Sequence, residues 1–447
     1  MSNPPARRAR IGLRVISSAG WRGGVNYIVN WARACAAVPD AERPEIWLLP
    51  FDEAGRAIAA DLAPLVAGIR PFAEAAALDL DMVYPATQIF EAPFDAPWAA
   101  WIPDWQCKHL PELFDEIEWA RRDLHYGLLA QRAPFLVLSS TMALEDSRRL
   151  YPDTLVPHAQ LPFPAWFDAA EVAAAREAEP AVRARHDLPE RYFLVANQWW
   201  RHKNHPIVLK ALARIDGDVS VVCTGAVSDP RWPDYPRTLL DSDEARGLGR
   251  RLRVLGSVDR AEQLALMLGA VAIIQPSRFE GWSTIVEEAR TLNLPLLLSR
   301  TPVHEEQSPP GCRFFDCDDA GGLAEAMRAS LREPRRPPPA ETAAQDEFVR
   351  GCVSRLCEVA LATRRAYDPK RHDPALLLAD LTADLAGGRH PPVLADKVGS
   401  AIRHMLASNP RARDRYGAAL AERHPGVRPD LGARAALARR LRSFLSR

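Results

Sequence analysis

The sequence lacks a net charge and long apolar runs. Its 57 Lys and Arg balance 57 Asp and Glu, so no field of the whole molecule attracts nucleic acid or an anionic surface. Apolar runs such as residues 269–274 are far shorter than the roughly 20 residues that cross a bilayer. The basic first residues are followed by neither the apolar stretch nor the cleavage site of a signal peptide. We expect a cytoplasmic protein that meets a membrane only from its surface.

Cysteine is scarce, and its spacing excludes the common zinc and thiol-redox motifs, which need a two-residue gap. Reduced, mostly buried thiols are expected at Cys35, Cys107, Cys223, Cys312, Cys317, Cys352 and Cys357. Apolar residues make up 47% and charged residues 26% of the chain, which is typical of globular proteins and not of disordered or fibrous ones. A chain of this length has room for two or three domains.

Short apolar runs alternate with helical stretches along the chain. This pattern favours βα units with helices on both faces of parallel sheets. The predicted strands are residues 11–16, 46–49, 135–138, 192–196, 219–223, 270–274 and 295–298. A stretch rich in Ala, Glu and Arg before residue 189 places a domain boundary near residue 185.

We therefore predict four parts: a first domain (1–185), a second domain (186–340), helices packing back towards the first domain (341–390) and a basic helical tail (391–447). Both domains are expected to be Rossmann-like and doubly wound, with ligand in a cleft at the carboxyl ends of the strands. A Pro- and Arg-rich segment at 332–341 precedes a predicted helix at 346–367.

The tail is locally basic, with twelve Lys and Arg and four acids from Asp396 onward. Leu437, Leu441, Phe444 and Leu445 recur at helical spacing. An amphipathic helix here would lie on anionic lipid at the inner face of the plasma membrane or on the protein's own first domain; a solvated helix is the plain alternative. The tail lacks the aromatic residues of a single-strand nucleic-acid platform, so no nucleic-acid partner is expected.

The segment PSRFEGWSTIVEEA at 276–289 is the most informative stretch, because it follows a predicted strand and enters a helix. Thr284 and Glu287 have the spacing of a capping box, which predicts a helix start near Thr284. The amides of residues 281–285 would then offer a phosphate site. Glu280 and Glu288 are placed to bind hydroxyl groups on either side of it; a helix cap and a solvated acid are the alternatives.

A second stretch, ANQWWRHKNHP at 196–206, carries two cations after a predicted strand. Arg201 and Lys203 at that position would neutralise a diphosphate leaving group through charge-assisted hydrogen bonds. A basic surface turn is the alternative.

Together these stretches resemble glycosyltransferase family four, a large retaining family with the GT-B fold. Its signature is matched by Pro276, Ser277, Glu280, Glu288 and Ala289. The resemblance implies that Glu280 contacts hydroxyls of the transferred sugar and that Glu288 holds the ribose. It further implies that the distal phosphate is held by the amides of Trp282, Ser283 and Thr284. Gly281, which has no side chain, allows the backbone to approach a ligand closely.

The resemblance covers most of residues 10–365. Segments 255–268 and 299–307 belong to it, and the loop at 256–258 would lie near the base. Gly23 and Gly24 would form a turn facing donor phosphate and acceptor, or be a simple turn. Segment 101–114 is similar to a branch of the family that builds bacterial surface glycans.

Two departures from the family bear on the site. Many members have Gly and Arg where Asn197 and Gln198 stand. Either Arg201 supplies the missing cation or the pocket is less basic, and Gln198 would contact the donor without charge. Many also have a His beside the reacting centre where Pro103 falls. Asp104 is then the candidate acceptor-facing group and His109 a second one, with ordinary structural roles as the alternative for both.

Metal dependence is not expected. An Asp-x-Asp pattern, which holds a cation in another transferase class, occurs at Asp79, Leu80 and Asp81, but it lies far from the predicted donor domain. Cations and helix amides already supply positive charge there. No cofactor is expected besides the nucleotide-sugar donor.

The resemblance implies a retaining, hexosyltransferase-like enzyme of polysaccharide synthesis, in which the acceptor-binding domain is residues 1–185 and the nucleotide-sugar-binding domain is residues 186–340. The donor domain binds a guanosine diphosphate-mannose or uridine diphosphate-glucose type of substrate, the acceptor is a glycan or lipid-linked glycan, and domain closure excludes water. An inverting transferase or sugar-nucleotide hydrolase is one alternative. A non-catalytic GT-B scaffold that binds nucleotide or glycan is the other.

Overall fold

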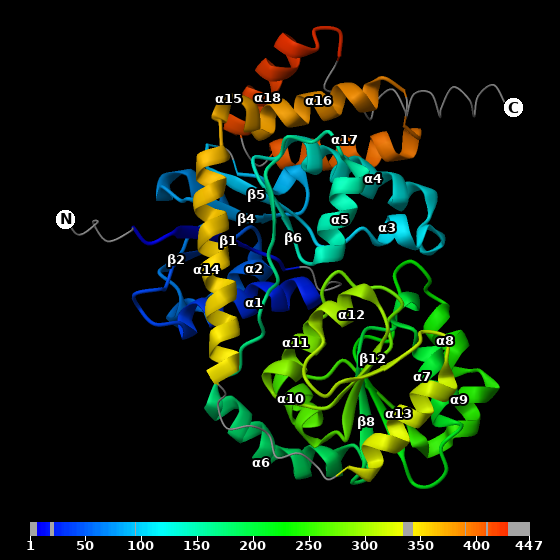
Figure 1. Cartoon of the computed structure of the whole chain (residues 1–447). Helices are drawn as coiled ribbons and strands as arrows, with labels where there is room; N and C mark the ends of the chain where they lie inside the picture. Colours follow the sequence, from blue (N-terminus) through cyan, green and yellow to red (C-terminus); the bar gives the residue numbers. More distant parts are fainter. Residues whose placement is uncertain are drawn as a thin grey trace, which may run out of the picture. The chain divides into compact units, whose positions relative to one another are not determined.

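The computed structural model describes residues 7–17, 22–93, 95–333, 343–388, 390–407 and 410–427. The chain divides into two compact units, each built on its own sheet (Figure 1). Unit 1 comprises Met1–Ser139, Ala143–Pro162 and Gly351–Arg447, and unit 2 comprises Ser140–Met142 and Phe163–Arg350.

Unit 1 contains a seven-stranded parallel sheet in the order β3-β2-β1-β4-β5-β6-β7. Its strands are β1 (Arg10–Val15), β2 (Glu45–Pro50), β3 (Gly68–Ile69), β4 (Met82–Ala86), β5 (Trp98–Ile102), β6 (Leu136–Leu138) and β7 (His158–Gln160). The helices that alternate with these strands are α1 (Arg22–Ala37), α2 (Glu53–Asp61), α3 (Gln106–His109), α4 (Glu116–Arg132) and α5 (Thr141–Leu150).

Unit 2 contains a six-stranded parallel sheet in the order β10-β9-β8-β11-β12-β13. Its strands are β8 (Tyr192–Ala196), β9 (Ser220–Thr224), β10 (Leu252–Gly256), β11 (Ala272–Gln275), β12 (Leu296–Ser299) and β13 (Arg313–Phe315). Its helices are α6 (Ala169–Arg185), η5 (Arg201–Lys203), α7 (His205–Leu212), α8 (Tyr235–Leu240), α9 (Asp243–Leu248), α10 (Arg260–Gly269), α11 (Thr284–Thr291), α12 (Pro302–Gln307) and α13 (Ala320–Arg332).

Helices cover both faces of the unit 2 sheet, because side chains of a buried strand alternate between two cores. In β8, Phe193 and Val195 pack in a cluster with residues of α7, α9 and α13. Tyr192 and Leu194 pack on the opposite face, in a cluster with residues of α6, α10 and α11. The doubly wound fold predicted from the apolar runs is confirmed.

The C-terminal part of the chain adds a helical layer to unit 1. It consists of α14 (Ala343–Ala366), which crosses the boundary between the units at residue 350, and of α15 (Pro369–His372), α16 (Pro374–Ala386), α17 (Pro392–Ala407) and α18 (Pro410–Arg423). Side chains of α16, α17 and α18 share one hydrophobic cluster with β4, β5 and β6, and Figure 1 shows these helices in orange and red beside that sheet.

Each of the seven predicted strands overlaps a strand of the structure: β1, β2, β6, β8, β9, β11 or β12. The helix predicted at 346–367 is α14. Helix α6 lies in unit 2, where it packs on α10, whereas the sequence analysis assigned residues up to 185 to the first domain. The predicted helix at 437–445 and most of the segment 332–341 lie outside the described residues.

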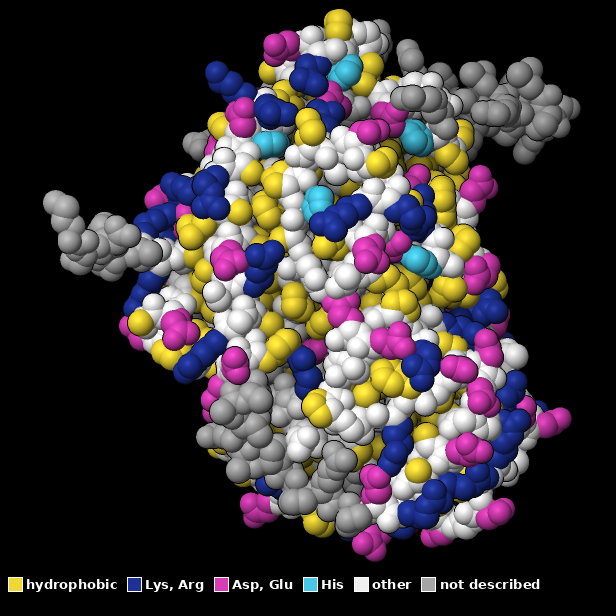
Figure 2. Space-filling view, viewed as in Figure 1, with side chains coloured by type: hydrophobic (Ala, Val, Ile, Leu, Met, Phe, Trp, Pro, Cys, Tyr) yellow, Lys and Arg dark blue, Asp and Glu magenta, His cyan; other side chains and the backbone are white. Residues whose placement is uncertain are grey.

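All seven cysteines are free, as predicted, and Cys35, Cys107, Cys223 and Cys352 are buried. Within the described residues, no helix is long and apolar enough to cross a membrane. On the face of the described residues shown in Figure 2, basic and acidic side chains are interspersed and form no extended area of one sign. This distribution agrees with the zero net charge.

Candidate functional site

The strand order of unit 2 reverses between β8 and β11. From β8 the chain builds outward to β9 and β10, and from β11 it builds outward to β12 and β13. Connections therefore leave these two strands in opposite directions, and a crevice for ligand is expected outside their carboxyl ends. Asn197 directly follows β8 and Gln275 ends β11, and Nδ2 of Asn197 donates to Oε1 of Gln275 at 2.6 Å.

Gln275 connects this point to the predicted acid Glu280. Its Nε2 donates to Oε1 of Glu280 at 2.8 Å and to Oγ of Ser283 at 3.0 Å. The ammonium of Lys203 lies 2.7 Å from the same oxygen. Glu280 as a residue is only 7% exposed. A buried carboxylate is stable only with such partners. The fold thus pairs Lys203 with Glu280, although the two residues are far apart in the sequence.

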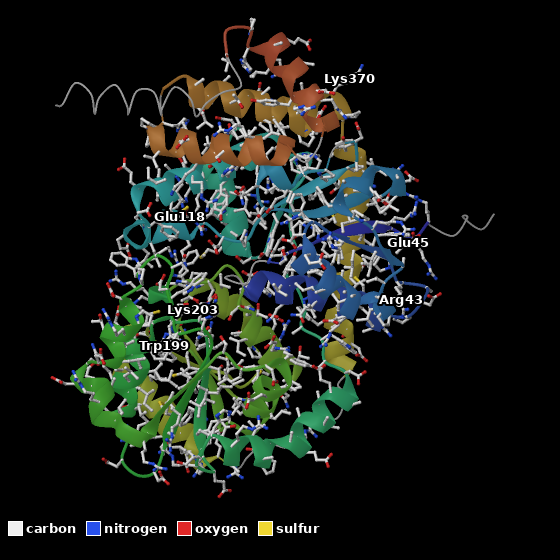
Figure 3. All side chains as sticks on the ribbon, turned by 180° about the vertical axis from the view of Figure 1, so that it is seen from behind. Arg43, Glu45, Glu118, Trp199, Lys203 and Lys370 are labelled. Carbon is white, nitrogen blue, oxygen red and sulfur yellow. The ribbon has the colours of Figure 1, made fainter. Side chains whose placement is uncertain are left out.

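The loop that carries Lys203 is fixed on both sides. Arg201 N donates to the carboxylate of buried Asp229 at 3.0 Å, and Asn204, in a left-handed conformation, donates through Nδ2 to the carbonyl of Cys317 at 2.9 Å. Gly225, at φ +103°, packs so closely that a Cβ there would lie 2.4 Å from the carbonyl oxygen of Asn197. Lys203 and the buried Trp199 of this loop are labelled in Figure 3.

Arg201 and Lys203, the two cations predicted for one role, have different surroundings. Lys203 pairs with Glu280. The guanidinium of Arg201 lies 4.4 Å from the ring centroid of Trp232 and 5.9 Å from that of Tyr235, and Arg201 is exposed. An Arg over an aromatic face is a cation–π arrangement, which gives Arg201 an aromatic partner that the sequence pattern did not indicate.

Helix α11 begins at Thr284, as predicted, but the predicted capping box is wrong. The N-cap is Ser283 and its side chain forms no cap hydrogen bond. Its backbone N–H instead donates to Oε1 of Gln307 at 2.9 Å, and Nε2 of Gln307 donates to Glu287 at 2.8 Å. The capping box does not form because Gln307 of α12 bonds both to the backbone N–H of Ser283 and to the side chain of Glu287.

Glu288 lies within α11, is 3% exposed and forms an ion pair of 2.9 Å with the guanidinium of Arg260. Arg260 begins α10 and its guanidinium lies 4.7 Å from the centroid of the Phe167 ring. The sequence does not indicate Arg260 as a partner of Glu288, because it precedes Glu288 by 28 residues and no recognisable motif connects the two. Glu288, the residue predicted to hold the ribose, therefore has a cationic partner, Arg260, that the sequence did not indicate.

The other residues predicted to bind the donor lie in the loop that follows β11 and in the loop that follows β8. Gly281 is buried, and Nε1 of the half-buried Trp282 donates to the carbonyl of Phe163 at 3.2 Å. Gln198 is half-buried and its carbonyl accepts from Trp200 N. The side chain of the preceding residue, Asn197, bonds to Gln275.

Four predicted residues lie in unit 1. Gly23 and Gly24 are in the first turn of α1, not in a turn before the helix. Asp104 follows β5, and its carboxylate accepts from the backbone N–H of Gln106 at 2.9 Å. His109 Nε2 lies 2.5 Å from Oδ2 of Asp146. Asp104 and His109 thus have structural partners in the same unit.

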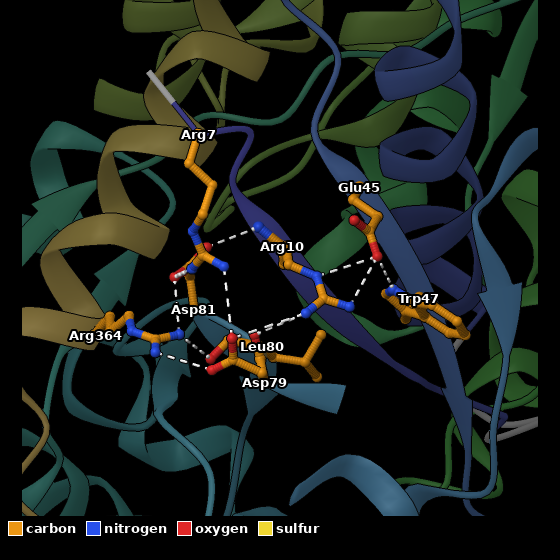
Figure 4. Close-up of polar contacts among 8 residues, drawn as sticks. All are labelled: Arg7, Arg10, Glu45, Trp47, Asp79, Leu80, Asp81 and Arg364. Atoms are coloured by element: carbon orange, nitrogen blue, oxygen red, sulfur yellow. Dashed lines mark hydrogen bonds and ion pairs between the residues drawn. The ribbon is translucent and has the colours of Figure 1, made fainter. Parts of the chain in front are cut away.

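The two carboxylates of the Asp-x-Asp pattern form ion pairs with arginines (Figure 4). The fully buried Asp81 pairs with Arg7 at 2.5 Å and with Arg364 at 3.2 Å, and it accepts from Arg10 N at 2.8 Å. Asp79 pairs with Arg364 at 2.9 Å. These carboxylates tie the start of β1 to α14, and the described residues contain no group of three or more potential metal-ligating acids, histidines or cysteines.

The sequence indicated no role for four polar residues in the hydrogen-bond network around the Glu280 loop: Asn197, Gln275, His304 and Gln307. Gln275 bonds to Glu280 itself, whereas Asn197 bonds to Gln275, Gln307 to Ser283 and His304 to Ser299. Gln275 offered a signal, since it is a polar residue at the end of the otherwise apolar strand AIIQ. His304 and Gln307 offered one only through their presence in the resembling segment 299–307. Their roles depend on the neighbouring strand and helix, so residue spacing alone does not indicate them.

Comparison with known proteins gives one family match, which lies wholly within unit 2. Residues 179–346 match the family model "Glycosyl transferases group 1". A comparison with curated protein sequences found no match.

Solved structures share the fold across both units. HepE from Anabaena, in complex with UDP and glucose, is 14% identical, with 85% of this chain and 100% of that chain covered and a TM-score of 0.52. Sucrose-phosphate synthase from Thermosynechococcus elongatus is 17% identical, with 79% and 97% covered and a TM-score of 0.52. At such identities the likeness shows the fold, which is GT-B: two Rossmann-like domains with parallel sheets. The fold and the family match together support a GT-B glycosyltransferase.

Proposed function

We propose that the protein is a retaining glycosyltransferase that moves a sugar from a nucleotide diphosphate-sugar to a glycan or lipid-linked acceptor. The observation that carries this proposal is the Lys203–Glu280 ion pair at the β8–β11 switch point, next to the N-terminus of α11. A donor diphosphate needs positive charge, and an ammonium with helix amides supplies it without a metal. The UDP and glucose in the HepE complex support a nucleotide-sugar donor.

Lys203 would stabilise the diphosphate as the glycosidic bond breaks and negative charge develops on it. Glu280 would accept hydrogen bonds from sugar hydroxyls, and Glu288, beside Arg260, would bind the ribose. Retention, a mannose or glucose donor, and a place in bacterial polysaccharide or surface-glycan synthesis in the cytoplasm follow from the family resemblance. Asp104 remains the proposed acceptor-facing residue, and peripheral membrane contact is assigned to the basic tail.

Nucleotide binding is the first test. Thermal unfolding of the full chain is measured with uridine, guanosine, adenosine and thymidine diphosphates and their sugars, in the presence of EDTA. A ligand that binds only the folded state adds about 2.7 kcal/mol of stability at a hundredfold excess over its Kd. We expect one base to give a selective shift, and Lys203→Ala to remove it.

Lys210→Ala is the matched control, because Lys210 is an exposed lysine on α7 of the same unit. It should keep the shift. A shift that survives Lys203→Ala would contradict the assignment of Lys203. Nucleotide binding without any transfer to acceptors would favour the scaffold alternative, and a product of inverted anomeric configuration would overturn retention.

A further inference from the structure

His304 lies in α12 and is completely buried. Its Nδ1 lies 2.8 Å from the carbonyl oxygen of Ser299 and 3.2 Å from Oγ of the same residue. A carbonyl oxygen can only accept, so Nδ1 must carry the proton and donate it. The other ring nitrogen, Nε2, is therefore a hydrogen-bond acceptor.

Nε2 of His304 is buried and has no hydrogen-bond partner among the described residues. A buried polar atom without a partner costs about 1–3 kcal/mol, so such atoms are usually satisfied by water or by a ligand. The polarity of this nitrogen is definite: a neutral acceptor binds a group that carries a hydrogen, and it repels a phosphate oxygen.

The imidazole belongs to the helix face that contacts the Glu280 loop. Gln307, three residues further along α12, lies on the same face and bonds to Ser283 and Glu287 of that loop and of α11. On the other side of His304, Oγ of Ser299 donates to the carbonyl of Ser277, at the start of the loop. Residues 277 and 283 thus bracket Glu280, and both are in contact with the segment that holds His304.

The electrostatic environment agrees with this placement. Burial lowers the pKa of His304 and keeps the imidazole neutral; the charges that act on it are Glu280, which opposes the lowering, and Lys203, which adds to it. Both members of the ion pair thus act electrostatically on the buried ring, in agreement with the contacts that Ser299 and Gln307 make with Ser277 and Ser283 on either side of Glu280.

We propose that Nε2 of His304 accepts a hydrogen bond from a hydroxyl group of the donor's sugar, an inference that rests on the nucleotide-sugar function proposed above. His304 would then help to distinguish the sugar-bearing donor from the free nucleoside diphosphate. Glu280 and His304 would be two acceptors for neighbouring hydroxyls, while Lys203 is left for the diphosphate.

The test compares His304→Asn with wild type by calorimetric titration with UDP, UDP-glucose, GDP and GDP-mannose. Asn can donate to the Ser299 carbonyl as Nδ1 does, but has no atom at the position of Nε2. We expect the Kd of the sugar nucleotide to rise about tenfold, the loss of one buried hydrogen bond, with the Kd of the corresponding diphosphate unchanged. His304→Gln places an amide oxygen near the Nε2 position and should restore part of the affinity.

Equal weakening of both ligands, or no weakening of either, would overturn the assignment of His304 and leave the proposed function intact; it would indicate that Nε2 bonds to an ordered water. Failure of wild type to bind any of the four nucleotides would instead count against the proposed function.

Should His304→Asn not fold, deoxy analogues of the donor sugar test the same bond on wild type and His304→Gln. One analogue should bind wild type about tenfold more weakly than the parent sugar nucleotide, with a smaller difference for the variant, as in a double-mutant cycle. If every analogue binds like its parent, no sugar hydroxyl is recognised and the inference is wrong.

Discussion

Glu287 and Glu288 are adjacent in the sequence but have different environments. Glu288 pairs with Arg260 of α10. Glu287 is fully buried, bonds to Gln307 and pairs with Arg290. Burial raises the pKa of Glu287 to about 7, although Arg290 and Gln307 oppose the shift. The Glu287 carboxyl group therefore binds a proton more tightly in the folded protein than in the unfolded chain.

This pKa shift predicts a pH dependence of stability. Between about pH 4.5 and pH 7 the unfolded chain has released the Glu287 proton while the folded protein retains it. The free energy of unfolding therefore falls as pH rises through this window, by at most about 1.4 kcal/mol per pH unit from this group. Glu287→Gln should remove that contribution, as measured by urea unfolding at several pH values.

Glu305→Gln is the control for this experiment, because Glu305 is an exposed acid on α12. It should leave the pH dependence as in wild type. A Glu287→Gln protein whose unfolding free energy declines with pH as steeply as that of wild type would show that Glu287 is not the titrating group.

At the scale of secondary-structure elements, the C-terminal helices form part of the core of unit 1. Leu394, Val398, Ile402 and Leu406 of α17 recur every four residues and are buried in one cluster with strands of the sheet. The basic residues of this region have specific partners as well: Arg423 pairs with Asp380 at 2.9 Å, and Arg415 pairs with Asp95 at 2.5 Å. The described part of the tail is thus a packed element of unit 1.

Adjacent residues of α17 offer a matched test of this packing. Leu394 is 0% exposed and belongs to the cluster, whereas Val393 is 43% exposed. Leu394→Ala should lower the free energy of unfolding by about 2–5 kcal/mol, since it removes buried methyl groups and leaves a cavity. Val393→Ala should change it by less than about 0.5 kcal/mol. Similar urea midpoints for both variants would contradict a structural role for α17.

At the scale of the whole molecule, charge is balanced overall but not along the chain. Residues 428–447 contain six arginines and one acid, and their structure lies outside the described residues. A basic segment gains about 1 kcal/mol per Lys or Arg near an anionic membrane surface. The membrane proposal therefore depends on this last segment more than on the net charge.

A chain ending at Val427 tests this proposal. Compared with the full chain, it should bind vesicles of phosphatidylserine and phosphatidylcholine at least roughly tenfold more weakly at low salt, because several arginines are lost. Neither chain should bind vesicles of phosphatidylcholine alone, and added salt should weaken binding of the full chain. Equal sedimentation of both chains with the anionic vesicles would locate membrane contact elsewhere.

The fold class and the positions of most central strands could be predicted from the sequence alone, with β4 and β5 of unit 1 as the exceptions. The run of β8 is apolar throughout because helices cover both faces of this strand. Edge strands such as β3, β7 and β10 escaped prediction, since they are short or polar and have a neighbour on one side only. The buried strand β4 escaped because Pro85 interrupts its sequence.

The contacts between polar residues of the site, in contrast, depend on the tertiary structure. The sequence singled out Lys203, Glu280 and Glu288 as functional candidates, but not that Gln275 joins Asn197 to Glu280 or that Arg260 faces Glu288. It also gave no reason to distinguish Arg201 from Lys203, which are two residues apart and lie against different partners. Residue spacing encodes local periodicity, whereas the partner of a buried charge is set by the strands and helices that the fold brings beside it.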